Sequence, residues 1–368
     1  MNEHLKQLQS WVNDQHLDIA YISDPTNIQY FSGFYSDPEE RILALFVFPD
    51  HEPFLFTPQL EVDAVKQTNW PYLVYGYLDH EDPFALIAEH IKKITKPIKW
   101  GIEKDNLSVE RYEAIKKQFP DAEFPVNVSK FIEHQKLIKT PAEIKIMKTA
   151  GREADYAFEV GFNALQTGRS EQDIVAEIEY ALMKKGVMKM SFDTIVQAGV
   201  DAADPHGEPK ATSKIQPNEL VLFDLGTVHQ GYMSDATRTV AYGKPSDQAL
   251  EIYKVCLEAQ QTAQAAVKPG ITAAQLDKVA RDIITKAGYG EYFIHRLGHG
   301  IGTSTHEFPS IMAGNDMELQ PGMCFSIEPG IYIPSIAGVR IEDCVHVTDT
   351  GCEPFTHTSK ALRYIDIK

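Results

Sequence analysis

The first third of the chain alternates between two kinds of hydrophobic pattern. Residues 3–15 and 82–94 place apolar side chains at helical spacing, whereas residues 18–23, 41–49 and 52–57 form short apolar runs. The first pattern predicts amphipathic helices and the second predicts strands. We therefore expect an N-terminal domain in which helices and strands alternate.

Two prolines indicate where this domain ends. Pro120 and Pro125 interrupt the periodicity, and the stretch Thr140-Pro141-Ala142-Glu143 has the form of a helix start with proline in its first turn. We predict three segments: a first domain at 1–125, a linker at 126–137 and a second domain at 138–368.

The second domain repeats its own pattern. Residues 162–186 align with 264–288, and each copy reads as a helix, a glycine turn, a Ser or Thr cap and another helix. Further on, residues 215–226 align with 319–330, which places Asp224 on Glu328, and His206 falls near His306. The shifts between the copies are nearly constant, which indicates two αβ halves related by a pseudo-two-fold axis. Such an axis would bring equivalent side chains of the two halves together.

Four carboxylates stand in stretches that otherwise predict a sheet. Asp224 and Asp235 flank the turn sequence GTVHQG, so we expect them on neighbouring antiparallel strands. Their counterparts in the second half are Glu328 in SIEPG and Glu342 in GVRIED. Buried carboxylates without partners are costly, and four together repel one another. Taken singly, each could be an ordinary turn or strand-end residue, but as a set they favour a site neutralised by cations.

His299, in the glycine-rich stretch GHGIG, supplies the imidazole that this set lacks. Carboxylates with one imidazole suit Mn, Fe, Co or Zn. Five donors are too many for one tetrahedral ion and suit two ions about 3.5–4 Å apart with shared carboxylates. Such a pair bridges a water, lowers its pKa and polarises an amide carbonyl. A lone histidine among glycines more often packs, so the prediction depends on the whole set.

Composition and charge narrow the class of partner. The chain has 368 residues, a net charge of −17 and a pI near 5.2, and phosphates would repel it, so we expect no nucleic-acid partner. The four cysteines form no C-x-x-C pair, which is typical of a reduced, cytoplasmic protein. No run approaches ~18 consecutive apolar residues, so we expect no membrane span.

The motifs FDLG…SDATRT, GHGIG…HE, SIEPGIY and GVRIED together resemble the pita-bread metallopeptidases, a group that includes prolidases, aminopeptidase P, methionine aminopeptidases and the metal-free creatinases. The resemblance is close over 138–368, and DIAYISDPTNIQYFSGF also resembles the creatinase-type N-terminal domain. Methionine aminopeptidases lack that domain and creatinases lack the metal ligands. The resemblance therefore implies an α/β (α+β) chain with a mixed-sheet first domain and a pita-bread catalytic domain. It further implies a homodimeric Xaa-Pro dipeptidase that uses two divalent ions, with Mn²⁺ expected first and Co²⁺ or Zn²⁺ as alternatives.

The resemblance also implies a role for each site residue. Asp224, Asp235 and Glu342 would hold one ion. Asp235, His299, Glu328 and Glu342 would hold the other. Glu328 would also carry the proton from the attacking water to the leaving nitrogen. His306 would donate a hydrogen bond to the developing oxyanion, His206 would contact the substrate, and Arg340 would hold a carboxylate of the cluster.

One position departs from the family pattern. Many relatives carry an arginine in an H-E-x-P-R motif, whereas this chain has HEFPS with Ser310 at that place. A dipeptidase must bind the free carboxylate of its substrate, for which a cation is best. We therefore predict that Arg296 binds the proline carboxylate beside Ser310. Two alternatives stay open: an Xaa-Pro aminopeptidase acting on longer peptides, and a binding module that has kept the fold without turnover.

Overall fold

The computed structural model of the protein describes residues 3–368, and Met1 and Asn2 lie outside them. The chain divides into two compact units, one ending at Lys136 and one spanning Leu137–Lys368. Among the described residues, no helix is both long and apolar enough to cross a bilayer.

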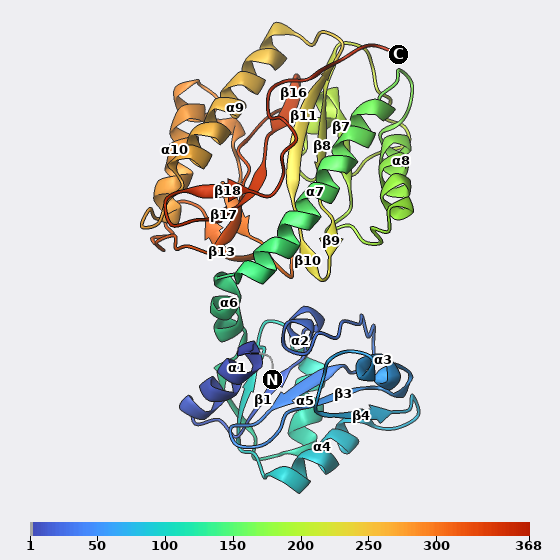
Figure 1. The fold of residues 1–368 in the computed structure, drawn as a ribbon, viewed down its shortest axis with the longest axis vertical. Helices are drawn as coiled ribbons and strands as arrows, with labels where there is room; N and C mark the ends of the chain where they lie inside the picture. Colours follow the sequence, from blue (N-terminus) through green and yellow to red (C-terminus); the bar gives the residue numbers. More distant parts are fainter. Residues whose placement is uncertain (1–2) are drawn as a thin grey trace. The chain divides into compact units, whose positions relative to one another are not determined.

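From residue 3 onward, the first unit contains six strands and six α-helices (Figure 1). The strands are β1 (Ile19–Ile22), β2 (Ala44–Val47), β3 (Phe54–Pro58), β4 (Leu73–Tyr77), β5 (Lys99–Ile102) and β6 (Glu123–Asn127). The helices are α1 (Glu3–Asp14), α2 (Pro25–Ser32), α3 (Val62–Lys66), α4 (Pro83–Ile94), α5 (Val109–Gln118) and α6 (Ser129–Leu137), with a 3₁₀ turn η1 (Gln59–Glu61) before α3. The strands form one mixed sheet in the order β4-β3-β2-β1-β5-β6.

Helices cover both faces of this sheet, and the alternation of side chains along β1 explains why. Ile19 and Tyr21 belong to a hydrophobic cluster with residues of α4 and α5. Ala20 and Ile22 belong to another cluster, with residues of α1 and α2. Because neighbouring strand residues point to opposite faces, a strand that is apolar throughout must be covered on both sides.

Several elements of this unit follow from the hydrophobic pattern. The predictions at 3–15, 18–23, 52–57 and 82–94 correspond to α1, β1, β3 and α4, and the strand predicted at 41–49 is shortened to β2. Residues 126–137, which we expected in a linker, form the end of β6 and helix α6. This helix is anchored within the first unit, since Gln135 Nε2 donates to the carbonyl of His4 at 2.8 Å.

The second unit contains four α-helices and thirteen strands. The helices are α7 (Pro141–Ala164), α8 (Glu171–Lys184), α9 (Asp247–Ala266) and α10 (Ala273–Lys286), with 3₁₀ turns η2 (Gly199–Ala203) and η3 (Gly290–Tyr292). The strands up to the middle of the unit are β7 (Ile195–Ala198), β8 (Glu219–Leu225), β9 (Val228–His229), β10 (Tyr232–Met233) and β11 (Ala236–Tyr242). The later strands are β12 (Gly298–Gly300), β13 (Glu307–Ile311), β14 (Cys324–Ile327), β15 (Gly330–Ile333), β16 (Ala337–Arg340), β17 (Asp343–Val347), β18 (Cys352–Pro354) and β19 (Tyr364–Ile365).

The repeat predicted from the sequence is visible as two similar halves. In the first, α7 and α8 pack with the sheet β19-β11-β8-β7, and in the second, α9 and α10 pack with the sheet β13-β12-β14-β17-β18. Even the helix starts match: α8 and α10 each follow a glycine at positive φ and begin with a capping box, built on Ser170 and Thr272. The helix start predicted at Thr140-Pro141-Ala142-Glu143 is the start of α7, where Thr140 and Glu143 form a third capping box.

Candidate metal centre

Asp224 and Asp235 enter the site from neighbouring strands of the first half. Asp224 is the sixth residue of β8, and Asp235 immediately precedes β11, which pairs antiparallel with β8. The short hairpin β9–β10 occupies the intervening turn. Both side chains are buried, at 8% and 5% exposure. The side chain of Asp224 accepts a hydrogen bond from Arg340 Nη2.

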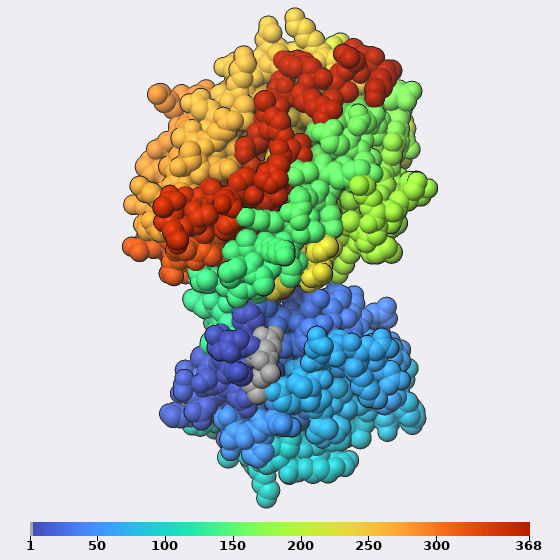
Figure 2. All heavy atoms as spheres, viewed as in Figure 1, coloured from blue at the N-terminus to red at the C-terminus, as the bar shows by residue number. Residues whose placement is uncertain are grey.

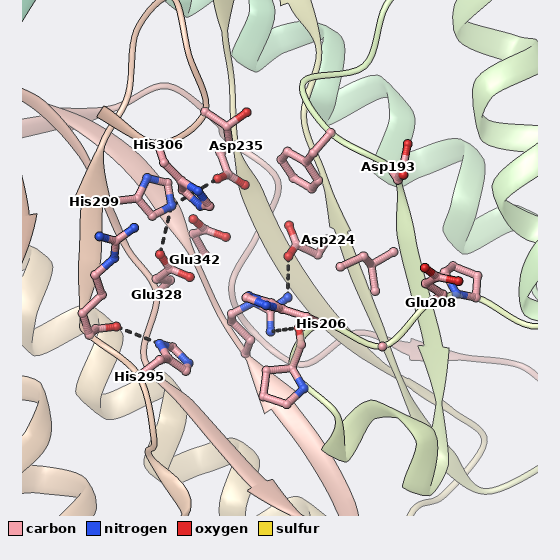
Figure 3. A pocket seen from close by; sticks show the side chains of 18 residues that line it. Asp193, His206, Glu208, Asp224, Asp235, His295, His299, His306, Glu328 and Glu342 are labelled. Atoms are coloured by element: carbon pink, nitrogen blue, oxygen red, sulfur yellow. Dashed lines mark hydrogen bonds and ion pairs between the residues drawn. The ribbon is translucent and has the colours of Figure 1, made fainter. Parts of the chain in front are cut away.

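His299, Glu328 and Glu342 come from the second half. His299 lies on β12, Glu328 directly follows β14, and Glu342 lies between β16 and β17. Figure 3 shows these three side chains and Asp235 pointing toward one another. Asp235, His299 and Glu342 each offer a ligand atom, and these atoms all lie within 4.8 Å of one another. The structure therefore brings acids from both halves to one place.

Hydrogen bonds fix the orientation of the donors. His299 Nδ1 donates to the carbonyl of Gly300 at 3.1 Å, which turns Nε2 toward Glu328 Oε1 at 3.1 Å and Asp235 Oδ2 at 3.6 Å. Ser326 Oγ donates to Glu328 Oε1 at 2.9 Å, and Thr237 Oγ1 donates to Glu342 Oε2 at 2.7 Å. A histidine held in this way presents a defined nitrogen to a metal ion.

The remaining carboxylate oxygens fit a cation. Within residues 3–368, Asp224 Oδ1 and Glu342 Oε1 are buried and lack a hydrogen-bond partner. Buried polar atoms are normally satisfied, so oxygens left open beside an imidazole suggest that another group completes them. Hard divalent ions accept this set of donors.

The electrostatics of the metal-free site point the same way. Burial, with the neighbouring charge of Asp224, raises the pKa of Asp235 well above its usual range, and burial with Asp235 does the same for Glu342. Burial also favours protonated Glu328, but contact with His299 outweighs it and lowers the pKa of Glu328 to about 2. Burial disfavours charged His299, yet Glu328 and Asp235 outweigh it and raise the pKa of His299. Without a cation, the cluster therefore holds protons that a metal ion would displace.

A pocket of about 570 Å³ opens above this cluster. The five candidate ligands line it together with His206, His306, Arg296 and Arg340, four further residues that the sequence singled out. His206 lies in the loop after η2, and the ring of His306 meets that of His299 edge to face, with centroids 4.2 Å apart. Phe192 also lines the pocket, whereas Ile301, another apolar residue near the motifs, is fully buried in a hydrophobic cluster.

Glu307 holds the loop that carries His306. Its Oε1 accepts hydrogen bonds from the backbone of Thr303 at 2.8 Å and of Ser304 at 3.2 Å, and its Oε2 pairs with Lys139 Nζ at 3.0 Å. Desolvation in the pocket wall, together with the charges of His299 and Arg296, lowers the pKa of His306 to about 4. His306 is therefore neutral at pH 7 and has a ring N–H to donate.

Arg296 and Ser310 contact each other at one side of the pocket. Arg296 Nη1 donates to Ser310 Oγ at 2.8 Å, and Ser310 lies on β13 directly across from His299 on β12. Arg296 lines the pocket. The hydroxyl of Ser310 is thus close enough to orient the guanidinium.

His295 also lines the pocket, although no sequence pattern indicated it. Its Nδ1 donates to the carbonyl of Arg296 at 2.7 Å, and its Nε2 accepts a hydrogen bond from Tyr332 at 2.9 Å. The Tyr332 hydroxyl in turn accepts a hydrogen bond from Arg340 Nη1 at 2.9 Å. Because Arg340 also donates to Asp224, these contacts connect His295 to a candidate ligand. No repeat or motif marks His295, and only its position four residues before His299 could have suggested it.

Comparison with known proteins agrees with this geometry. Residues 145–349 match metallopeptidase family M24, and residues 4–138 match the creatinase/prolidase N-terminal domain. The chain is 58% identical over 367 residues to an Xaa-Pro dipeptidase of Lactobacillus delbrueckii subsp. lactis, covering 99% of this chain and 100% of the relative.

Two solved structures are also similar over nearly the whole length. An Xaa-Pro dipeptidase from Bacillus anthracis superposes with a TM-score of 0.91 at 36% identity, covering 98% of this chain and 99% of the other. A prolidase from Pyrococcus horikoshii OT3 gives a TM-score of 0.90 at 36% identity, with 98% and 100% covered. Both the expected fold class and the expected family are confirmed, and the chain with this acid- and histidine-lined pocket belongs to metallopeptidase family M24.

Proposed function

We propose that the protein hydrolyses the Xaa-Pro bond of dipeptides with two divalent metal ions. The observation that carries the proposal is the buried cluster of Asp235, His299 and Glu342, with ligand atoms within 4.8 Å of one another beneath a pocket of about 570 Å³. The full-length similarity to an Xaa-Pro dipeptidase supports the choice of substrate class.

We assign the two ions to overlapping sets of ligands. Asp224 would bind the first ion only, and His299 and Glu328 the second only. Asp235 and Glu342 would bind both, a role that suits their place in the middle of the cluster. When bound, such a pair lowers the pKa of a water and polarises the scissile carbonyl.

Glu328 is the residue that moves the proton. It lines the pocket, and contact with His299 outweighs burial to lower its pKa, so the carboxylate is already ionised before any ion binds. It can accept a proton from the attacking water and deliver it to the proline nitrogen, which lacks an N–H in the Xaa-Pro bond. His306, neutral and directed into the pocket, would donate to the developing oxyanion. His206 would contact the substrate from the loop after η2.

Arg296 would recognise the carboxylate of the proline residue. Ser310 orients it through the 2.8 Å hydrogen bond to its Nη1. Arg340 has a different role: its guanidinium contacts Asp224 and the Tyr332 hydroxyl, so it would hold a ligand rather than the substrate.

Hydrolysis of a matched dipeptide and tripeptide panel tests the proposal. With metal content measured on the same sample, we expect rapid release of proline from Xaa-Pro, slow or no cleavage of Xaa-Pro-Xaa, and loss of activity with a chelator that Mn²⁺ restores. Faster cleavage of the tripeptide would indicate the aminopeptidase alternative instead. A protein that binds peptides but hydrolyses neither, with metal present, would indicate the binding module.

Three finer features remain proposals. We propose Mn²⁺ as the metal, because oxygen donors dominate the ligand set and one imidazole completes it. We also propose a homodimer, from the family resemblance, and a cytoplasmic location, from the four cysteines without a C-x-x-C pair. Metal analysis of protein isolated from its native cells and light scattering on the eluting peak test the first two, and cell fractionation tests the third.

A further inference from the structure

A second charged cluster lies behind the proposed metal ligands. Asp235 and Thr237 face the pocket side of their strand, and the next residue along, Arg238, faces the opposite side. In the same way Glu342 faces the site while Asp343 faces away. Arg238 and Asp343 are almost completely buried, at 2% and 1% exposure. Glu342 is therefore followed directly by a buried charge, Asp343, and Asp235 is followed three residues later by another, Arg238.

The Arg238 guanidinium joins these two strands. Its Nη2 donates to Asp343 Oδ1 at 2.6 Å, and its Nη1 donates to the carbonyls of Glu342 and of Thr237. Its Nε and Nη2 also donate to the carbonyl of Thr358, at 2.9 and 2.7 Å. All three nitrogens are used, and one contact is to the main chain of a proposed ligand, Glu342.

The hydrogen bonds from Arg238 to Glu342 and Asp343 lie where the two halves of the second unit meet. β11 and β17 belong to different sheets, so no regular ladder sets their separation. Besides the contacts of Arg238, Glu342 N donates to Thr237 O at 3.0 Å and Thr239 Oγ1 donates to Arg340 O at 3.0 Å. These few hydrogen bonds and the guanidinium of Arg238 therefore hold the two strands, and with them Asp235 and Glu342, at their separation.

The C-terminal segment completes the cluster. Lys360 Nζ contacts Asp343 Oδ2, and Thr356 Oγ1 donates to Asp343 Oδ1 at 2.7 Å. Asp155 of α7 holds this segment by accepting from the backbone of Thr358 at 2.7 Å. Figure 2 shows the C-terminal residues as a red band on the surface of the second unit, between green α7 and gold α9.

We propose that Arg238 is a positioning residue for the metal centre: by tying Asp343 and the carbonyl of Glu342 to β11, it sets the separation of Asp235 and Glu342 and so the affinity for the metal pair. Partners behind metal ligands commonly change affinity about 10- to 100-fold when they are removed. The proposal rests on the ligand assignment given under Proposed function.

The Arg238→Lys variant tests this. Lysine keeps the positive charge that Asp343 needs, but it lacks the planar fork and cannot reach Asp343, Glu342 O and Thr358 O together. We expect Mn²⁺ affinity, measured by calorimetric titration of metal-free protein, to fall about 10- to 100-fold. We expect near-wild-type turnover to return at saturating Mn²⁺. A merely structural role would instead lower the melting temperature of the metal-free protein and leave Mn²⁺ affinity unchanged, which would overturn the proposal.

Arg363→Lys is the matched control, because Arg363 pairs with Glu159 at 2.7 Å on the exposed surface of the same unit. Its Mn²⁺ affinity should equal that of the wild type. If Arg238→Lys does not fold, Asp343→Asn decides, since it removes the carboxylate to which Arg238 Nη2 donates: weaker Mn²⁺ binding supports the proposal and unchanged binding overturns it. A wild-type protein that binds no Mn²⁺ would refute the proposed function itself, whereas equal binding by wild type and Arg238→Lys would refute only the role of Arg238.

Discussion

Asp235 is the residue at which stability and function conflict most directly. Burial and the charge of Asp224 raise its pKa well above the usual range for aspartate. A carboxyl whose pKa rises on folding contributes stability below its unfolded pKa, and that contribution is lost as pH rises through the folded pKa. In the metal-free protein, Asp235 is therefore unfavourable to the fold at neutral and alkaline pH.

The Asp235→Asn substitution should then have opposite effects on stability and activity. We expect the metal-free variant to be more stable than the metal-free wild type at pH 8 by about 0.5–2 kcal/mol, a usual size for stabilising substitutions. The difference should shrink toward pH 4, where the wild-type carboxyl is protonated. Hydrolysis and Mn²⁺ binding should be lost, because the residue is assigned to both ions. Thermal melts with and without chelator measure the first effect, and exposed Asp316→Asn serves as the control. Retained activity would contradict the ligand assignment.

Arg296 gives a prediction about substrate length. Hydrogen bonds to charged groups contribute about 1.5–3 kcal/mol, so Arg296→Ala should raise KM for Xaa-Pro about 10- to 100-fold. The effect on Xaa-Pro-Xaa should be much smaller, because the carboxylate of a tripeptide lies one residue further away. Ser310→Ala keeps the guanidinium and loses only the 2.8 Å contact that orients it, so its effect should be smaller than that of Arg296→Ala. Equal losses on both peptides would rule out carboxylate recognition by Arg296.

At the scale of residues, the sequence indicated the four acids because they stand in stretches that otherwise predict a sheet and that recur in the two halves. It indicated His299 as the imidazole of the glycine-rich stretch GHGIG. It could not indicate Arg238 or His295. Arg238 looks like an ordinary polar residue of an alternating strand, and its partners Asp343 and Thr358 lie more than a hundred positions away. Contacts of this range depend on how two sheets meet, which no local pattern contains.

At the scale of elements, the approach of β12 to β14 determines where His299 lies. A Cβ at Gly298 would lie 1.8 Å from the carbonyl oxygen of Ser326 on β14, which is backbone and cannot rotate away. The strand that carries His299 thus depends on a glycine for its close packing, as strand glycines often do.

Gly298→Ala should therefore damage the fold and the site together. Forcing the strands apart should lower the free energy of unfolding by about 1–3 kcal/mol, as overpacking does. Because His299 is the next residue, Mn²⁺ affinity should fall as well. Gly351→Ala is a suitable control, since its added Cβ would meet only Val267 O at 3.8 Å. Chemical denaturation and Mn²⁺ titration measure both effects, and a variant as stable and as tightly binding as the wild type would show that β12 can shift freely.

The elements themselves were unevenly predictable. Helices and strands with strong periodicity, such as α1, β1 and α4, and the repeated caps of α8 and α10, follow from local sequence. Helix α6 did not follow from local sequence, because it is short and lacks a clear apolar face. Contacts with other parts of the first unit, such as Gln135 to His4, stabilise it instead. The pairing of strands into the two larger sheets of the second unit followed only in outline, from the repeat.

At the scale of the whole molecule, a net charge of −17 favours cations over anions near the surface, but salt screens this effect over roughly 10 Å. Selection of a divalent ion must therefore come from the buried site in the second unit. Binding to the folded state alone stabilises a protein by about 2.7 kcal/mol when the ligand is present at 100 times its Kd. The melting temperature should consequently rise with Mn²⁺ concentration.

Because Mn²⁺ and protons compete for the same side chains, Mn²⁺ affinity should depend on pH. In the metal-free state, burial raises the pKa of Asp235 and Glu342, and the carboxylates outweigh burial to raise that of His299. Each group holds a proton until pH exceeds its raised pKa, and Mn²⁺ must displace it. Affinity should therefore be weaker at pH 6 than at pH 8, with protons released on binding. Calorimetric titrations in two buffers of different ionisation enthalpy count these protons, and Asp235→Asn should abolish the signal. Binding without proton release, or stronger binding at pH 6, would mean that the acids are already ionised before the metal arrives.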